Sequence, residues 1–359
     1  MKKVLIATCC IALLSGSLSV SAQTLAGKSW SADNGNGTFT NPLFYDEFSD
    51  PDIIRVGEDY YLAGTTMHSV PGLVVLHSKD LVNWEFSSYC FDRLDDSDDF
   101  NLRNGKEAYG QGIWAPAIRY HNGKFYIFSN INGHGLQVYI SDSAKGPWTH
   151  HKVNGDIYDL SVLFDEDGKI YAVHKYGNVT VTELKPDLSG PVEGSSKVVI
   201  PEGNAMGEGH HVYKINGMYY ILSADYSPMG RMQCARSKSI WGPYETCVIS
   251  ERESYGYAAG WSVGNMGIGR PLPEDGFKFQ NNKPNGVKLG CATIHQGGIV
   301  QAPDGKWWGV SMQDFNAVGR TVCLSPITWV DGWPYFGLEK NLGRSPRTLS
   351  LIHISEPTR

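Results

Sequence analysis

Three acidic residues occupy nearly the same place in three copies of one sequence pattern. Asp50, Asp159 and Glu208 each precede a run of alternating apolar residues and stand eleven or twelve positions before an aromatic residue of a second run. Carboxylates crowded around one narrow site repel one another, so at least one pKa rises and a protonated acid stands beside ionised ones near neutral pH. A proton donor and a proton acceptor held around one substrate can perform general acid–base chemistry. We therefore take these three residues as the candidate catalytic set.

The pattern that carries these acids is a β-hairpin. It has a polar start, alternating apolar residues, a turn with Gly, Asn or Asp, and an aromatic pair that opens the second strand. It recurs five times, at residues 50–64, 115–129, 159–173, 209–223 and 296–310. A weaker repeat, expected to form outer strands, follows three of the copies at residues 77–85, 141–150 and 236–245.

The spacing of the repeats suits a four-stranded sheet repeated around an axis. Runs with helical apolar spacing are scarce after the N-terminus, and a β-sandwich would not explain five copies of one hairpin. The sequence therefore predicts an all-β chain folded as a five-bladed β-propeller. The first strand of each blade lines the axis of a propeller, so equivalent positions should converge on one mouth. Those positions hold Asp50, Trp114 with Ala115, Asp159, Glu208 and Gln296.

Taken singly, each acid also fits a structural role: Asp50 in a turn before Pro51, Asp159 as a cap at a strand entry, and Glu208 in an exposed loop. As a converging set they fit the cleavage of a glycosidic bond with inversion. In that reaction one acid protonates the leaving oxygen, and a base about 6.5–9.5 Å away activates a water on the opposite face of the sugar.

The segments around the acids resemble glycoside hydrolase family 43, a family of five-bladed propellers. The similarity runs from about residue 41 to about residue 344. It rests on Asn41-Pro42, Asp50-Pro51-Asp52, Gly112-Ile113-Trp114-Ala115-Pro116, Asp159-Leu160-Ser161, Glu208-Gly209-His210-His211, His295-Gln296-Gly297-Gly298 and Leu342-Gly343-Arg344.

The resemblance implies a role for each acid. Asp50 would be the general base, Glu208 the general acid, and Asp159 the residue that orients and tunes the acid. Asp52 would not be the base, because the family's base precedes the proline. The implied activity is the inverting release of L-arabinose or D-xylose from hemicellulose of the xylan or arabinoxylan type, by an α-L-arabinofuranosidase or a β-xylosidase.

The resemblance also implies a sugar pocket. Trp114 would form one wall, Arg344 would contact sugar hydroxyls, and Gln296 would line the mouth. Met67 and His68 stand where some xylose-specific members have an aromatic residue, which leaves the choice between arabinose and xylose open.

The axis of the propeller is the place implied for an ion. His295 would lie there, where family members can hold a hydrated calcium or sodium ion. No cofactor is required for the chemistry. A zinc site is not expected, because no cysteine shows a Cys-x-x-Cys or Cys/His ligand spacing.

Composition and charge restrict the partners. The formal net charge of −6 and pI near 6.0 offer no basic surface for a nucleic acid. Residues 1–22, two lysines followed by an apolar stretch and small residues, are typical of an export signal. We expect a secreted or periplasmic protein that is not membrane-bound after cleavage and acts on plant cell-wall oligo- or polysaccharide.

The expected organisation is a signal peptide at 1–22, a propeller catalytic domain at 23–344 and a C-terminal tail at 345–359. The last ten residues, SLIHISEPTR, resemble translated sequencing-adapter sequence, which would make this a truncated gene model lacking the β-sandwich of many family members. Two alternatives remain: a non-catalytic carbohydrate-binding propeller, and another propeller hydrolase such as an arabinanase. The box sequences of sucrose-type fructosidases and of sialidases are absent.

Overall fold

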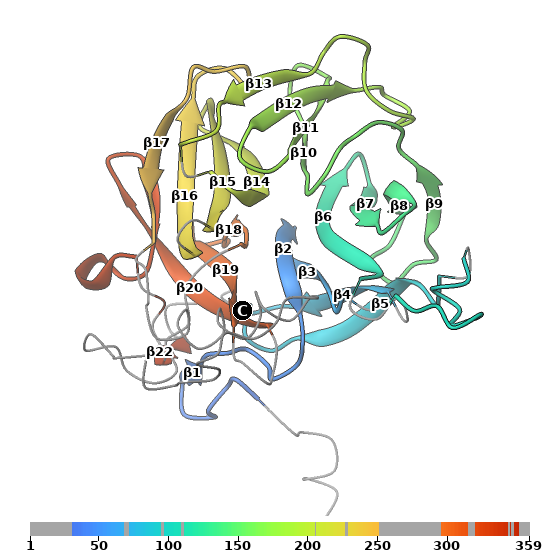
Figure 1. Ribbon diagram of the computed structural model, residues 1–359. Coiled ribbons are helices and arrows are strands. Elements are labelled where there is room, and N and C mark those ends of the chain that lie inside the picture. Colours follow the sequence, from blue (N-terminus) through green and yellow to red (C-terminus); the bar gives the residue numbers. More distant parts are fainter. Residues whose placement is uncertain are drawn as a thin grey trace, which may run out of the picture.

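Five four-stranded antiparallel sheets surround a central axis, which confirms the predicted five-bladed β-propeller (Figure 1). The computed structural model describes residues 31–67, 72–94, 97–108, 111–204, 206–226, 229–250, 296–314, 320–343, 345 and 348–351. These residues are almost entirely in strands, turns and bends, with a short 3-10 helix at Glu339–Asn341. Within these ranges, no helix has the length and apolar character needed to cross a membrane.

Each blade is formed by four consecutive strands, numbered from the axis outward. Blade 1 contains β2 (Ser49–Val56), β3 (Asp59–Thr65), β4 (Gly72–Ser78) and β5 (Glu85–Phe91). Blade 2 contains β6 (Ile113–His121), β7 (Lys124–Ile131), β8 (Gly135–Ser141) and β9 (Thr149–Lys152). Blade 3 contains β10 (Ser161–Phe164), β11 (Ile170–His174), β12 (Val179–Leu184) and β13 (Lys197–Ile200).

The last two blades follow the same order. Blade 4 contains β14 (Glu208–Ile215), β15 (Met218–Tyr226), β16 (Met229–Ser237) and β17 (Glu245–Val248). Blade 5 contains β18 (Ile299–Gln301), β19 (Trp307–Asp314), β20 (Arg320–Val330) and β21 (Trp333–Phe336). The five predicted hairpins are the two inner strands of each blade. The weaker repeat links the third and fourth strands of blades 1, 2 and 4, also as predicted.

The hydrophobic core is divided into five clusters, one between each pair of neighbouring blades. Successive residues of a strand point to opposite faces of the sheet, and both faces of a blade are covered. In β7, for example, Ile127 packs towards blade 1 and Phe128 towards blade 3, and neither is exposed. Burying one such side chain stabilises the fold by about 1.5–3 kcal/mol. This two-sided burial explains why an inner strand such as β7 has apolar residues at consecutive positions as well as at the alternating positions noted in the sequence.

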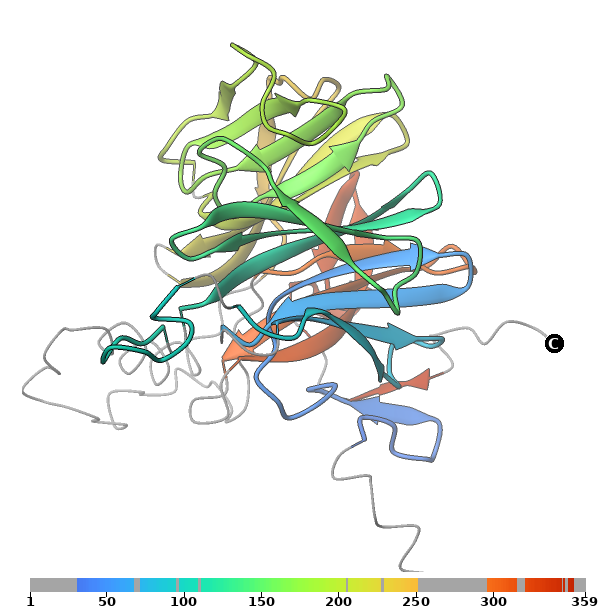
Figure 2. The same ribbon diagram turned by 90° about the vertical axis from the view of Figure 1, so that its right-hand side faces the viewer.

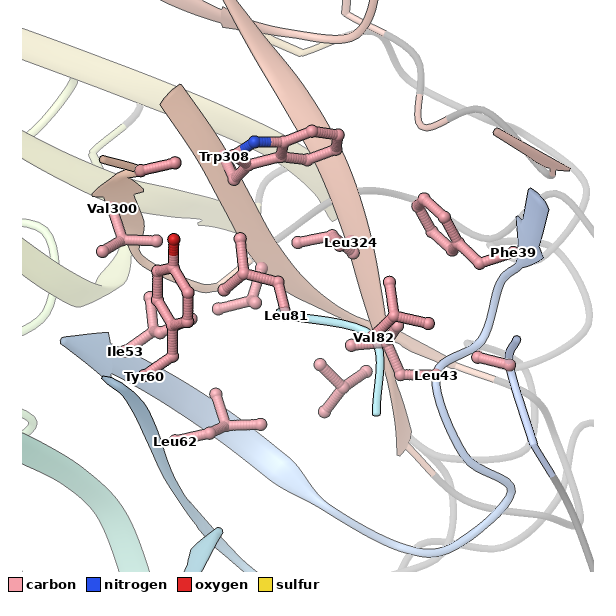
Figure 3. Packing of buried hydrophobic residues seen from close by; sticks show 14 of the residues in the cluster. Phe39, Leu43, Ile53, Tyr60, Leu62, Leu81, Val82, Val300, Trp308 and Leu324 are labelled. Atoms are coloured by element: carbon pink, nitrogen blue, oxygen red, sulfur yellow. The ribbon is translucent and has the colours of Figure 1, made fainter. Parts of the chain in front are cut away.

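The ring closes where blade 5 meets blade 1. The Asn41 side chain donates to the Leu324 carbonyl at 2.8 Å and accepts from the Leu324 N–H at 2.9 Å. The backbone N–H of Phe48 donates to the carbonyl of Arg320 at 2.8 Å. The segment before β2 is therefore held along β20. Figure 3 shows the cluster packed at this junction, formed by Phe39, Leu43, Ile53, Tyr60, Leu62, Leu81, Val82, Val300, Trp308 and Leu324.

A two-stranded ribbon lies outside the five sheets (Figure 2). It pairs β1 (Thr38–Thr40) with β22 (Thr348–Ser350) in antiparallel register. Leu349 of β22 is buried in the cluster at the blade 5–blade 1 junction. Packed structure therefore continues beyond residue 344, where the sequence predicted the end of the propeller. The predicted signal peptide at 1–22 lies outside the described residues.

Candidate active site

Four of the five inner strands begin with an unusual backbone conformation at or beside the positions predicted to converge. Asp50, Asp159 and Gln296 have φ values of 52°, 51° and 43°, and Gly209 has 66°. This left-handed region is uncommon for residues other than glycine, and such strain is concentrated at functional sites. The conformation turns the chain sharply where these four inner strands start. It thereby sets the direction of the side chain at the mouth.

The strand register shows that Glu208 lies one residue before the position occupied by the other two acids. Asp52 pairs with Ala63 in blade 1, and His211 pairs with Leu222 in blade 4, each two residues after the aromatic anchor. Gly209 is therefore the counterpart of Asp50, and Glu208 precedes it. Both strands carry a register irregularity at this point, and β-bulges of this kind commonly re-aim side chains beside active sites.

Asp159 is buried and is hydrogen-bonded to the next blade. Its Oδ2 accepts a hydrogen bond of 2.7 Å from the backbone N–H of Gly209, which joins the first strands of blades 3 and 4. Burial, with the nearby negative charges of Glu208 and Asp50, raises the pKa of Asp159 well above its usual range, against the opposing effects of the Gly209 N–H and Arg320. The structure thus brings the three predicted acids into one electrostatic cluster, and Asp159 is a member with a raised pKa.

Asp50 is buried and faces a positive charge. Its Oδ1 lies 3.4 Å from Nη1 of Arg320 on β20 of blade 5, and its N–H points to the Met312 sulfur at 3.5 Å. A guanidinium close to a carboxylate favours the ionised form. Asp50 is therefore in an environment suited to a base.

Glu208 is half-buried and is contacted by a neighbouring phenol. The Tyr158 hydroxyl donates a hydrogen bond of 2.8 Å to Oε2 of Glu208. The pKa of Tyr158 is raised, first by burial and then by the nearby negative charges of Glu208, Asp159 and Asp50. The phenol therefore stays protonated and acts as a donor at neutral pH.

A side chain of blade 2 fixes the start of blade 3 through two hydrogen bonds. The Asn130 side chain donates to the carbonyl of Ile157 at 2.9 Å and accepts from the backbone N–H of Asp159 at 3.2 Å. These two bonds fix the segment that carries Tyr158 and Asp159. Asn130 thus connects the core of one blade to the candidate catalytic residues of the next.

The predicted pocket residues are placed as follows. The Gln296 side chain packs on Gly209, where a Cβ would come within 2.5 Å of its Cγ. Trp114 is half-buried in the irregular start of β6. Met67 has a φ of 60°, and its carbonyl accepts from the N–H of Gly112 at 3.1 Å. Gln296 therefore borders the acid cluster, and Met67 lies beside the segment that carries Trp114.

Three predicted site residues, His68, Arg344 and His295, lie outside the described residues. Their roles in sugar or ion binding stay predictions. In the described part of the chain, no group of three or more His, Cys, Asp or Glu side chains is arranged to hold a metal ion.

Asp52, two residues after Asp50, belongs to a separate network on the axis. Its carboxylate accepts from the N–H groups of Ile53 and Ile118, both at 2.9 Å, and from Nη1 of Arg119 at 2.5 Å. Arg119 also donates to Ser161 of blade 3, and His211 of blade 4 lies 3.6 Å from Asp52. Through these contacts Asp52 links the blades.

Sequence reasoning missed two residues, Tyr158 and Arg320, that contact the carboxylates of the acids. Tyr158 directly precedes a candidate acid and could have been found by asking which neighbours of the acids can donate hydrogen bonds. Arg320 lies at the start of the third strand of blade 5, not of an inner strand. The repeat pattern does not predict this residue, because it comes close to Asp50 only when blade 5 meets blade 1 and closes the ring.

Comparisons with known proteins agree with the propeller fold. The model of glycosyl hydrolases family 43 matches residues 39–256. A non-reducing end α-L-arabinofuranosidase of Bacteroides ovatus is 33% identical over 90% of this chain and 58% of its own length. A β-xylosidase of Formosa agariphila is 30% identical over 87% of this chain and 53% of its own length.

A solved structure described as a bifunctional GH43-CE protein of Bacteroides eggerthii is also similar. It has a TM-score of 0.71 and 32% identity, over 87% of this chain and 37% of its own. The chain thus spans little more than half the length of the two curated relatives. Family match, identity and fold agree, and the chain belongs to glycosyl hydrolases family 43.

Proposed function

We propose that this protein is an inverting glycoside hydrolase that releases L-arabinose or D-xylose residues from xylan- or arabinoxylan-type hemicellulose. The observation that carries the proposal is the cluster of Asp50, Asp159 and Glu208, contributed by blades 1, 3 and 4 to one site. Relatives named β-xylosidase and α-L-arabinofuranosidase support the substrate class. Because both names occur at similar identity, the proposal includes both sugars.

In the proposed reaction Asp50 is the general base. It takes a proton from a water that attacks the anomeric carbon, and Arg320 beside it favours the ionised carboxylate that this step needs. Glu208 is the general acid and gives its proton to the leaving oxygen as the glycosidic bond breaks. Each turnover leaves Asp50 protonated and Glu208 ionised, and proton exchange with solvent resets the pair.

Asp159 acts on Glu208 through charge and position. The repulsion that raises the pKa of Asp159 also acts on Glu208, because Coulomb interaction between two carboxylates is mutual. An ionised Asp159 therefore favours a protonated Glu208. The bond from Gly209 to Asp159 holds the backbone next to Glu208 at a fixed place. Asp159 is thus a positioning residue for the acid.

The proposal is tested by hydrolysis of p-nitrophenyl α-L-arabinofuranoside and p-nitrophenyl β-D-xyloside side by side, with arabinoxylan oligosaccharides as natural substrates. We expect release from at least one aryl glycoside and its loss in Asp50→Asn. The matched control is Asp142→Asn, which changes an exposed carboxylate that pairs with Lys124 on blade 2. Absence of release from every substrate by the folded protein would contradict the proposal.

We also propose that the chain is exported. The two lysines and the apolar stretch of residues 1–22 support export, as expected of a protein that acts on a polysaccharide too large to enter a cell. N-terminal sequencing of the protein expressed in a bacterial host would test this. A mature N-terminus near Gln23 is expected, and an intact Met1 in the cytoplasmic fraction would contradict it.

A further inference from the structure

Tyr158 differs from the other exposed aromatic residues by its partner. Its hydroxyl lies 2.8 Å from Oε2 of Glu208, and the residue is 42% exposed. Part of its surface therefore faces solvent at the mouth while the hydroxyl is directed at an acid. Because the ring is only partly buried, packing alone does not account for its placement, and the hydrogen bond to Glu208 of the next blade is the contact that distinguishes it.

The backbone around Tyr158 is fixed on two sides. Asn130 binds the carbonyl of Ile157 and the N–H of Asp159, the residues before and after it. The carbonyl of Tyr158 accepts from the N–H of Lys175 at 2.9 Å, and Lys175 itself has a φ of 79°. The phenol therefore extends from a rigid segment, which is the arrangement needed to hold a partner side chain in one orientation.

The geometry points to Tyr158 as a positioning residue that holds and tunes the acid Glu208 on the leaving-group side of the site. This inference rests on the proposed function. Because the phenol occupies Oε2, the transferable proton is directed to Oε1 of Glu208. A general acid stands beside the leaving oxygen, so the exposed face of the Tyr158 ring borders the part of the substrate that departs.

The effect of the hydroxyl on the protonation of Glu208 has a definite sign. A donor to the ionised carboxylate stabilises the charged form, so removing it should raise the pKa of Glu208. Among the described residues, the charged groups that act on the acid cluster include Asp159, Asp50 and Arg320. All three remain in a Tyr158→Phe variant, so a change in the pH profile reports the lost hydroxyl.

The test compares Tyr158→Phe, Tyr158→Ala and the wild type in the full chain. In Tyr158→Phe we expect the alkaline limb of kcat/KM to move up by about one pH unit, the size expected for one hydrogen bond to a charged group. On natural oligosaccharides kcat should fall about tenfold, while KM and the rate with a p-nitrophenyl glycoside change little. Tyr158→Ala should also raise KM for oligosaccharides, since it removes the ring.

The matched control is Tyr120→Phe. Tyr120 is 43% exposed, like Tyr158, but lies near the far end of β6, next to the Asn122-Gly123 turn. This variant should leave the pH profile and both rates unchanged. A Tyr158→Phe variant that loses activity without moving the alkaline limb would overturn the tuning role. An inactive wild type would instead remove the proposed function, so the two failures are distinguishable.

Discussion

Acidic side chains have different surroundings at the mouth of the propeller and on the axis next to it. The mouth brings three carboxylates close together, those of Asp50, Asp159 and Glu208. The Arg320 guanidinium lies beside Asp50. On the axis, Asp52 has Arg119 and two backbone N–H groups as partners and is 1% exposed. Two aspartates separated by one proline thus lie in contrasting environments. Carboxylates crowded together mark the candidate chemistry, whereas a carboxylate paired with a guanidinium and two backbone N–H groups joins the blades.

The largest expected effect separates the two acids that exchange protons at the mouth. Asp50→Asn should slow natural and aryl substrates alike by about 10²–10⁴-fold, because both need an activated water. Glu208→Gln should slow natural oligosaccharides by a similar factor but spare a p-nitrophenyl glycoside, whose leaving group needs no proton. Steady-state rates on both substrates measure this. Equal losses in Glu208→Gln on the two substrates would remove it from the acid role.

The next largest effect should appear in stability at the axis. Asp52→Asn leaves the Arg119 guanidinium without its carboxylate, and breaking a buried pair costs about 3–5 kcal/mol of unfolding free energy. Urea unfolding measures this loss, with Asp50→Asn as the neighbouring control. At a temperature where Asp52→Asn is folded, it should retain far more activity than Asp50→Asn. An inactive Asp52→Asn with unchanged stability would reverse the comparison.

A smaller change in stability is expected at Asp159, where replacing the carboxylate should stabilise the fold. Burial and two neighbouring carboxylates raise its pKa in the folded state, so the folded protein binds more protons than the unfolded chain above the usual aspartate pKa of about 3.9. Stability is therefore lost as pH rises from that value through the raised pKa.

Asp159→Asn removes this loss while preserving an acceptor for the Gly209 N–H. The variant should be about 1 kcal/mol more stable than the wild type at neutral pH, with the gain disappearing below about pH 4, while activity falls. Thermal unfolding across pH provides the measurement. A destabilised variant at neutral pH would show that the aspartate is a net support of the fold.

The sequence was sufficient to predict the blades, for a physical reason, while the catalytic roles of the three acids stay predictions. Alternating apolar residues and turn residues are local signals, and five copies of one hairpin can be superposed without knowing the fold. That superposition placed Asp50 and Asp159 correctly at the strand starts. It placed Glu208 one position off, because Gly209 takes the left-handed conformation in blade 4.

Contacts between blades could not be predicted in this way. Arg320 approaches Asp50 because the segment before β2 runs along β20 and closes the ring. Arg119 reaches Asp52 of blade 1 and Ser161 of blade 3 from β6. These contacts depend on how blades are tilted and spaced around the axis. No periodicity within a single blade carries that information.

The most direct test of the central claim follows the configuration of the first sugar released. Asp50 as a base and Glu208 as an acid on opposite faces of the sugar require a single displacement by water. Proton NMR of the reaction, recorded before mutarotation, should show the anomer opposite to that of the substrate. Initial release of the substrate's own anomer would imply a covalent intermediate with Asp50 as its nucleophile, and would contradict the account.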